Sequence, residues 1–234
     1  MTKSELIEYL SKNGLFLSEK QIFELERYRE LLEEKNRAMN LTAITEKEEV
    51  YEKHFLDSLL FSFGEKMDNL NCVDVGSGAG FPGLVVAICY PQVAMTLLEP
   101  IGKRCGFLNE VIRELKLKNV TVVHARSEDF CREHSEEFDL ALARGVSKLN
   151  ILLEIVLPLL KVDGIFVALK GKIFREEIDD SARALKVLNA EIERIKEGTL
   201  PTNRDLRANL FVRKKSSTPK MYPRQYAKIK KQPL

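Results

Sequence analysis

From residue 70 onward, short apolar runs alternate with stretches whose apolar residues recur at helical spacing, and this alternation constrains the fold most strongly. Short apolar runs suit buried strands, and the longer periodic stretches suit helices. We therefore predict an α/β fold, a doubly wound and mostly parallel seven-stranded sheet whose first five strands are linked by helices of about ten to sixteen residues. The expected strands are 72–75, 94–98, 120–124, 140–143, 165–169, 191–196 and 210–213, and two of the helices are 103–115 and 149–160.

The two ends of the chain differ from this middle part. Residues 197–209 join the last two expected strands without a helical pattern, which favours an antiparallel hairpin at the sheet edge. Apolar residues at helical spacing before residue 62 predict an N-terminal helical extension, with Thr45 and Glu48 spaced as a capping box. We expect a helical segment over 1–69 packed on the core, a ligand-binding sheet domain over 70–215, and a basic tail over 216–234 too polar to pack as an element.

Composition limits the class of protein. The chain is 44% apolar and 31% charged, as in soluble globular proteins, and its N-terminus has no signal-peptide pattern. Its most apolar window, 84–98, is interrupted by Pro91 and Gln92, so we expect no membrane span and a cytoplasmic location. The four cysteines show no metal-ligand spacing, so we expect buried thiols and no metal site.

Charge is distributed unevenly along the chain. Residues 1–60 carry nine Lys and Arg against thirteen Asp and Glu, net −4, whereas residues 201–234 carry ten against one, net +9. A basic end on a nearly neutral protein suggests a polyanionic partner. The alternative is a solvated tail that aids solubility.

Four glycines within eight positions follow the first expected strand, in the stretch NCVDVGSGAGFPGL. In a doubly wound sheet, ligands bind beyond the carboxyl end of such a strand. The letters GAGFPG match the dinucleotide pattern G-x-G-x-x-G, which suggests an NAD-dependent oxidoreductase. However, Phe81 and Pro82 stand where amide donors should face a pyrophosphate, and proline has no N–H.

A second alignment of the loop begins at Asp74 and reads D-x-G-x-G-x-G through Gly76, Gly78 and Gly80. This pattern is typical of S-adenosylmethionine enzymes, whose cofactor carries an ammonium and a sulfonium and no phosphate. An acidic residue suits these cations and would repel a pyrophosphate. Glu99, at the end of the second strand, can hydrogen-bond ribose hydroxyls in either cofactor class. We therefore favour a methyltransferase.

The ends of the third, fourth and fifth strands carry further candidates. Ser127, Glu128 and Asp129 suit the edge of an adenine, although Glu128 and Asp129 could instead be an acid pair at a helix N-terminus. Arg144 could bind a guanine edge or a phosphate, or form a surface ion pair. Lys170 is a second cation on the same rim.

The fourth strand also limits the methyl acceptor. It lacks both the [DN]-P-P-[FY] segment of amino-group methyltransferases and a cysteine nucleophile for pyrimidine C5. A ring nitrogen such as guanine N7 offers its lone pair without a general base, so catalysis could rest on positioning and desolvation. Because N7 lies in the narrow major groove of A-form RNA, the target should be a loop or an unpaired nucleotide.

These residues closely resemble the bacterial 16S ribosomal RNA guanine-N7 methyltransferases, the glucose-inhibited division protein B family. The resemblance covers nearly the whole chain. Two departures are Glu99, where Asp is more frequent, and Ala227 with Ile229, where Gly and Pro are common. The matching segments are NLTAIT (40–45), KHFLDSLL (53–60), DVGSGAGFPG (74–83), FDLALARGVSKL (138–149), LPLLK (157–161), ALKGK (168–172) and the terminal YPR and KKQPL.

The resemblance implies a class I S-adenosylmethionine-dependent methyltransferase fold and methylation of the guanine at RNA position 527, in the 530 loop of 16S rRNA. The partner would be 16S rRNA or a small-subunit precursor, met by a monomer. The resemblance suggests that His54 and Asp57 border the active pocket, although a helix-packing role fits the sequence equally. The implied cofactor contacts are Gly76, Phe81, Ser127, Glu128 and Arg144, to which the pattern adds Asp74, Gly78, Gly80 and Glu99. The candidate RNA contacts are Lys103, Arg104, Arg144, Lys170, Arg224, Lys228, Lys230 and Lys231.

A third hypothesis is a ribosome-binding protein that holds S-adenosylmethionine only as a ligand, because no general base is evident. The catalytic candidates, Arg144 and Lys170, are both cations and neither is a proton acceptor at neutral pH. The sequence therefore leaves the identity of any chemical catalyst open.

Overall fold

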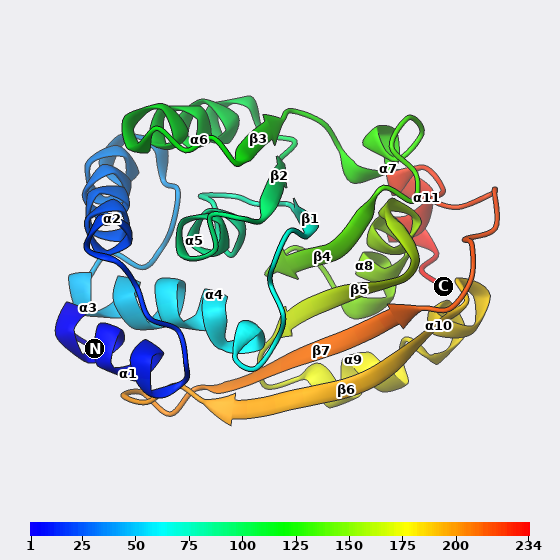
Figure 1. Ribbon diagram of the computed structural model, residues 1–234. Helices are drawn as coiled ribbons and strands as arrows, with labels where there is room; N and C mark the ends of the chain where they lie inside the picture. The colour runs from blue at the N-terminus through cyan, green and yellow to red at the C-terminus, as the bar shows by residue number, and fades with distance from the viewer.

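A seven-stranded sheet of order β3-β2-β1-β4-β5-β7-β6 forms the centre of the computed structural model, which describes residues 1–234 (Figure 1). Strands β1 to β5 are parallel, and β7 runs antiparallel to both β5 and β6. The predicted doubly wound sheet with an antiparallel edge hairpin is therefore confirmed. The strands are β1 (Asn71–Val75), β2 (Ala94–Leu98), β3 (Val120–Val123), β4 (Phe138–Arg144), β5 (Leu160–Lys170), β6 (Ala190–Thr199) and β7 (Leu206–Lys214).

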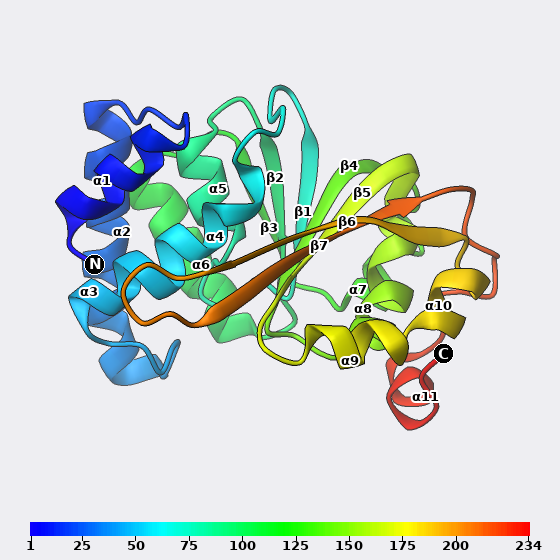
Figure 2. The same cartoon turned by 90° about the horizontal axis from the view of Figure 1, so that it is seen from below.

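Helices cover both faces of this sheet. Figure 2 shows α2, α4, α5 and α6 on one side of the strands and α8, α10 and α11 on the other. The helices are α1 (Lys3–Lys12), α2 (Glu19–Met39), α3 (Lys47–Glu49), α4 (Asp57–Leu59), α5 (Gly83–Cys89), α6 (Gly102–Leu115), α7 (Ser127–Phe130), α8 (Leu149–Val156), α9 (Phe174–Asp179), α10 (Ala182–Val187) and α11 (Tyr226–Lys231), with a π-helix η1 (Val50–Leu56) and 3-10 helices η2 (Leu60–Ser62) and η3 (Leu157–Leu159).

The sheet divides the hydrophobic core into two clusters. Successive strand residues point to opposite faces, so Cys72 belongs to one cluster while Val73 belongs to the other. The first cluster includes Leu10 and Leu32 of the N-terminal helices together with residues of β1, β4 and β5. The N-terminal helices therefore share a continuous core with the sheet.

Several predicted boundaries are wrong for local reasons. The predicted helix 149–160 divides into α8 and η3, because Pro158 lacks the N–H that a continuing α-helix needs, and β5 begins at Leu160. The links α5 and α7 have only 7 and 4 residues, fewer than expected. Thr45 does not cap a helix: α3 begins after Glu46, which makes no side-chain capping bond.

The C-terminal tail packs as an element, so the prediction that it would not is wrong. It forms α11, in which Ile229 is fully buried, and its last residue, Leu234, is also buried in the second core cluster. Ile229 is one of the two tail positions at which the sequence departs from the family that it resembles. The sequence made the segment look solvated because its few apolar side chains are separated by lysines.

No helix is long and apolar enough to cross a membrane.

The four cysteines are free and buried, as predicted. Burial raises the pKa of Cys131 to about 11 and the pKa of Cys72 and of Cys89 still further. These thiols are therefore protonated at neutral pH and unreactive. No group of three or more His, Cys, Asp or Glu side chains is placed to hold a metal ion.

The sheet order creates a switch point between β1 and β4, where the chain turns to opposite faces. The carboxyl ends of the parallel strands meet along one edge there. This edge carries the glycine loop after β1, Glu99 after β2, Ser127 after β3 and Arg144 at the end of β4. The fold therefore brings together candidates that lie up to 70 residues apart in the sequence.

The first turn of α5 should tolerate no side chain at Gly83. A Cβ there would lie 2.4 Å from Leu97 Cδ2 and 2.7 Å from Asp74 Oδ2. We expect Gly83→Ala to lower the free energy of unfolding by about 1–3 kcal/mol, as overpacked core positions do. Gly106→Ala is the matched control, because Gly106 is an exposed residue of α6 whose Cβ would meet no atom within 4 Å, and it should raise stability by up to about 1 kcal/mol. Urea unfolding measures both, and equal effects would contradict the tight packing at Gly83.

Candidate active site

The glycine loop spans residues 76–82, between the end of β1 and the start of α5. Gly76 and Gly80 have φ values of +74° and +103°, in the region that side-chain-bearing residues avoid. Gly76 N–H donates to Leu98 O of β2 at 2.7 Å, and a Cβ on Gly76 would lie 2.6 Å from Val146 Cγ2. Glycine is therefore required where the loop passes between β2 and the segment after β4.

Asp74 lies beneath this loop and is fully buried. Its Oδ2 accepts a hydrogen bond from Gly83 N–H at 2.9 Å, whereas its Oδ1 has no partner. Burial raises the pKa of Asp74 to about 7, although the hydrogen bond from Gly83 and the charge of Arg144 oppose the rise. Asp74 thus joins the end of β1 to the start of α5 and keeps one unpaired oxygen.

Glu99 connects the loop to the end of β2. Its Oε2 accepts from Gly78 N–H at 2.8 Å and its Oε1 from Ile101 N–H at 2.9 Å, while Arg104 Nη1 is 3.8 Å from Oε1. Each carboxylate oxygen can accept two hydrogen bonds, so the carboxylate retains capacity for a hydroxyl group. The predicted contact between Glu99 and ribose remains a prediction.

A hollow of about 100 Å³ opens beside the loop. Both Ser127 and Glu128 line it and are buried, and Ser127 Oγ donates to Ile155 O at 2.5 Å. Burial raises the pKa of Glu128, whose carboxylate forms no ion pair, whereas Asp129 is exposed and lies 3.5 Å from Arg132. The two acids therefore differ, and Glu128 is directed toward the hollow.

Arg144 meets the N-terminal segment at the end of β4. Its Nη1 donates to Lys53 O at 3.0 Å and to Asp57 Oδ2 at 2.9 Å, and its Nη2 lies 3.0 Å from His54 Nδ1. Asp57 Oδ1 also accepts from Arg207 Nε at 2.9 Å. Arg144 is therefore held by the H-x-x-D segment in a defined orientation, and the surface ion pair with a Glu does not form.

His54 connects Arg144 to Thr42 through its two ring nitrogens, and its ring is neutral. Burial and the charge of Arg144 lower the pKa of His54 to about 3. Because a guanidinium only donates, Nδ1 of His54 must accept, and its Nε2–H donates to Thr42 Oγ1 at 2.8 Å. Asn36 in turn fixes Thr42 through two hydrogen bonds of 2.9 Å to its backbone.

Phe81 joins the glycine loop to the N-terminal segment. Its ring stacks on His54 at 4.1 Å and on Tyr28 at 5.5 Å, and the Arg144 guanidinium lies 5.2 Å from its centroid. Tyr28 OH donates to Ala79 O at 2.5 Å. The sequence does not distinguish Tyr28 from the other apolar residues of its helix, nor does it single out Thr42 within the segment NLTAIT (40–45).

Known proteins match this chain over nearly its whole length. Residues 21–206 match the family rRNA small subunit methyltransferase G. The chain is 43% identical over 228 residues to the protein of that name from Bacillus licheniformis, with 96% of this chain and 95% of that protein covered. It is 44% identical to the one from Thermoanaerobacter pseudethanolicus, with 98% and 97% covered. The chain belongs to this family.

Solved structures of lower identity share the fold of this family member. The crystal structure of M. jannaschii TYW2 in complex with AdoMet matches with a TM-score of 0.58 at 15% identity, over 74% of this chain and 79% of that one. The Bacillus subtilis YcgJ structure matches with a TM-score of 0.54 at 13% identity, over 70% and 100%. At these identities the likeness concerns the fold alone.

Lys170 is not the free rim cation that the sequence suggested. Its side chain is 8% exposed, and Nζ donates to Glu177 Oε2 at 2.6 Å and to Ser147 O at 2.8 Å. Glu177 also accepts from Leu149 N–H at 2.7 Å, so the pair secures the segment between β4 and α8. Burial lowers the pKa of Lys170, and Glu177 and Ser147 engage its ammonium, so a contact between Lys170 and RNA stays a prediction.

Three of the other predicted RNA contacts bond to groups within the chain, although Lys103 is itself exposed, and three do not. Lys103 Nζ donates to Met39 O at 3.2 Å, and Arg104 lies close to Glu99. Arg224, also predicted as an RNA contact, forms an ion pair with the fully buried Glu154. The remaining three, which we name the tail lysines, are exposed on α11: Lys228, Lys230 and Lys231.

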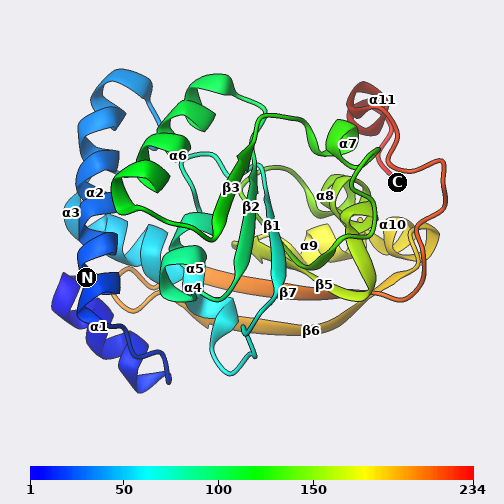
Figure 3. The same ribbon diagram turned by 45° about the horizontal axis from the view of Figure 1, so that its top comes forward.

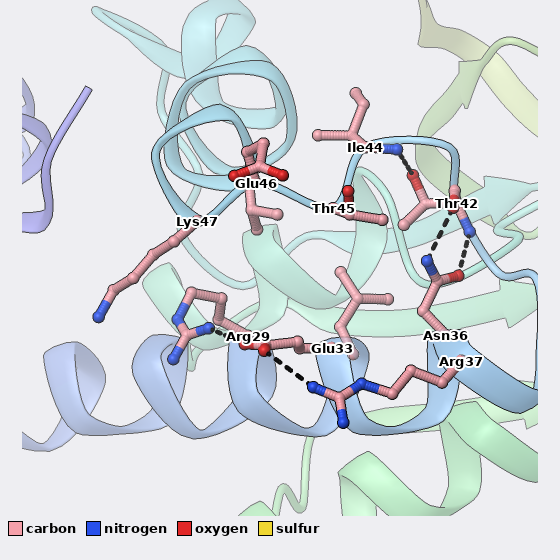
Figure 4. Close-up of a pocket in the computed structure, with 11 residues that line it drawn as sticks. Arg29, Glu33, Asn36, Arg37, Thr42, Ile44, Thr45, Glu46 and Lys47 are labelled. Atoms are coloured by element: carbon pink, nitrogen blue, oxygen red, sulfur yellow. Dashed lines mark hydrogen bonds and ion pairs between the residues drawn. The ribbon is translucent and has the colours of Figure 1, made fainter.

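A larger hollow of about 530 Å³ lies at the N-terminal side of the site, between α2 and residues 42–50 (Figure 4). Figure 4 shows Glu33 between Arg29 and Arg37, at 2.8 and 3.6 Å. Thr42 lines this hollow and is hydrogen-bonded to His54. The hollow therefore adjoins the hydrogen-bond network that orients Arg144.

The lowered pKa of His54 predicts a pH dependence of stability. Above about pH 6.5 the ring is neutral in both folded and unfolded chains, and its contribution is complete. As the pH falls from 6.5 toward 3, only the unfolded chain takes up the proton, so stability is lost by up to about 1.4 kcal/mol per pH unit. His54→Gln can keep an acceptor and a donor without titrating, and its stability should fall less steeply over this range in urea titrations. A folded-state NMR titration of His54 near pH 6.5 would contradict the neutral state of the ring.

Proposed function

We propose that this chain transfers a methyl group from S-adenosylmethionine to N7 of the guanine at position 527, in the 530 loop of 16S rRNA. Membership of the rRNA small subunit methyltransferase G family, over nearly the full length, is the observation that carries the proposal. The substrate would be 16S rRNA or a small-subunit precursor in the cytoplasm, bound by a monomer.

The residues around the glycine loop fit this cofactor. At Gly78 a Cβ would meet no atom closer than Gly76 O at 3.9 Å, so the loop offers an open cradle for a ligand. Glu99 can accept ribose hydroxyls, and Glu128 can accept from the amino group of adenine. Oδ1 of Asp74, which has no partner, supplies an unused polar atom beside the loop. No phosphate is required at Pro82, which lacks the N–H that a dinucleotide would use.

When bound, the cofactor would supply an electrophilic sulfonium methyl group to the N7 lone pair, which would leave a neutral thioether and a positively charged guanine ring. No proton is transferred in this step, so the chain needs no general base. The neutral His54 is accordingly a positioning residue. It holds Arg144 and supports Phe81, which together shape the site.

Arg144 retains donors for a ligand. A guanidinium carries five N–H groups. Three are used by Lys53, Asp57 and His54, which leaves the Nε–H and one Nη2–H. The side chain is 16% exposed, so these donors can reach the cofactor carboxylate or guanine O6. Either acceptor would be placed by charge-assisted hydrogen bonds without occupying the N7 lone pair.

Labelled S-adenosylmethionine should modify one guanine in 16S rRNA, or in small subunits, from cells that lack this modification. We expect Arg144→Lys to lower kcat/KM by about 100-fold, because an ammonium cannot keep the three anchoring contacts and also donate two hydrogen bonds to a ligand. Arg183→Lys is the matched control, an exposed arginine on α10, and should retain full activity. Mapping the labelled base completes the measurement.

The absence of labelling on both naked rRNA and subunits would refute the proposed reaction. Calorimetry with NAD and with S-adenosylmethionine provides an independent check. Binding of NAD alone would restore the dinucleotide interpretation of GAGFPG.

The tail lysines should contribute to RNA affinity by binding phosphates. Replacing all three by Gln should make the log–log dependence of the binding constant on salt less steep, by about 0.7 for each phosphate that the variant no longer neutralises. Substitution is preferable to deletion of 216–234, because deletion would also remove Ile229 and Leu234 from the core. An unchanged slope would show that the tail lysines do not bind RNA phosphates. The control triple replaces exposed lysines elsewhere on the chain: Lys12, Lys20 and Lys118.

A further inference from the structure

The C-terminal segment contributes to the lining of the hollow beside the glycine loop. The hollow is lined by Val75, Gly76 and Leu98 at the ends of β1 and β2, and by Ser127 and Glu128 after β3. Tyr226, the first residue of α11, lines the same hollow. Figures 1 and 3 both show α11 beside α7.

Buried contacts hold α11 in this position. Glu154 of α8 is fully buried and accepts three hydrogen bonds from Arg224, from its backbone N at 2.9 Å, Nε at 2.7 Å and Nη2 at 2.6 Å. Arg224 Nη2 also donates to Gln232 O at 3.1 Å, which ties the two ends of the helix together. Ile229 and Leu234 pack into the second core cluster. A six-residue helix would not persist alone, so these anchors place Tyr226.

The ring of Tyr226 is partly buried and bordered by a cation. The guanidinium of Arg126, which also lines the hollow, lies 5.2 Å from the ring centroid. An aromatic ring beside an unpaired, buried carboxylate combines the two features that recognise a purine: a flat apolar surface and an acceptor for an exocyclic amino group. The hollow therefore has the chemistry of a nucleobase site.

We propose that α11 is part of the cofactor site and that Tyr226 packs against the adenine of S-adenosylmethionine. The proposal rests on the proposed function, because it takes the hollow at Ser127 and Glu128 as the adenine site. It gives the C-terminal segment a role in cofactor binding that is separate from the charge of its lysines. The segment that looked like a solvated tail thus contributes Tyr226 to the lining of the hollow.

The test is the affinity for S-adenosylhomocysteine and for adenosine, measured by calorimetry on the full chain without RNA. We expect Tyr226→Ala to weaken both ligands by a similar factor, about 10- to 100-fold, since the ring would touch only the base that the two ligands share. Tyr226→Phe keeps the ring and should stay within about threefold of the wild type. Gln225→Ala, at the exposed neighbouring position, is the control and should bind normally.

Loss of folding is separated from loss of binding by a second variant. Tyr226→Leu retains apolar packing against the core and should show the wild-type unfolding temperature without ligand, yet bind both ligands more weakly. If the wild type binds S-adenosylhomocysteine and both Tyr226→Ala and Tyr226→Leu bind it equally well, the role of Tyr226 is overturned while the proposed function stands. If the wild type binds neither S-adenosylhomocysteine nor S-adenosylmethionine, the proposed function fails first.

Discussion

The structure of the site depends on hydrogen bonds between buried side chains and the backbone of the glycine loop. Asp74 accepts from Gly83 N–H, Glu99 accepts from Gly78 N–H, and Tyr28 donates to Ala79 O. Two of these groups belong to the sheet and one to the N-terminal helices. A loop with several positive φ values loses much conformational entropy on ordering, and these buried partners offset that loss.

The N-terminal helices therefore contribute to the site as well as to the core. Phe81 stacks between His54 and Tyr28, and Arg144 is oriented by Asp57 and by the neutral ring of His54. The low pKa of His54 follows from burial beside a fixed cation, so its neutral form is a result of the same packing that positions Arg144. For the reaction proposed above, which would require no proton transfer, positioning of this kind is the main contribution a protein can make.

Positive charge is used in two ways in this chain. The buried or half-buried cations Lys170, Arg207 and Arg224 each pair with a carboxylate and join separate segments of the chain. The tail lysines are exposed and remain available to a polyanion. The sequence alone does not distinguish the two groups. Whether a Lys or Arg side chain is paired depends on which carboxylate the fold brings beside it.

The sequence by itself determined the order of strands and helices, the glycine loop, and the family, because local periodicity and contiguous motifs record these features directly. It also identified the positions along one edge of the sheet, since the carboxyl ends of parallel strands must meet there. Only the tertiary structure decided that Lys170 and Arg224 are engaged, that His54 bridges Arg144 and Thr42, and that Tyr226 reaches the hollow beside Gly76. Arg144 and His54 are 90 positions apart and Arg224 and Glu154 are 70 apart, and no local pattern encodes a partner at that distance.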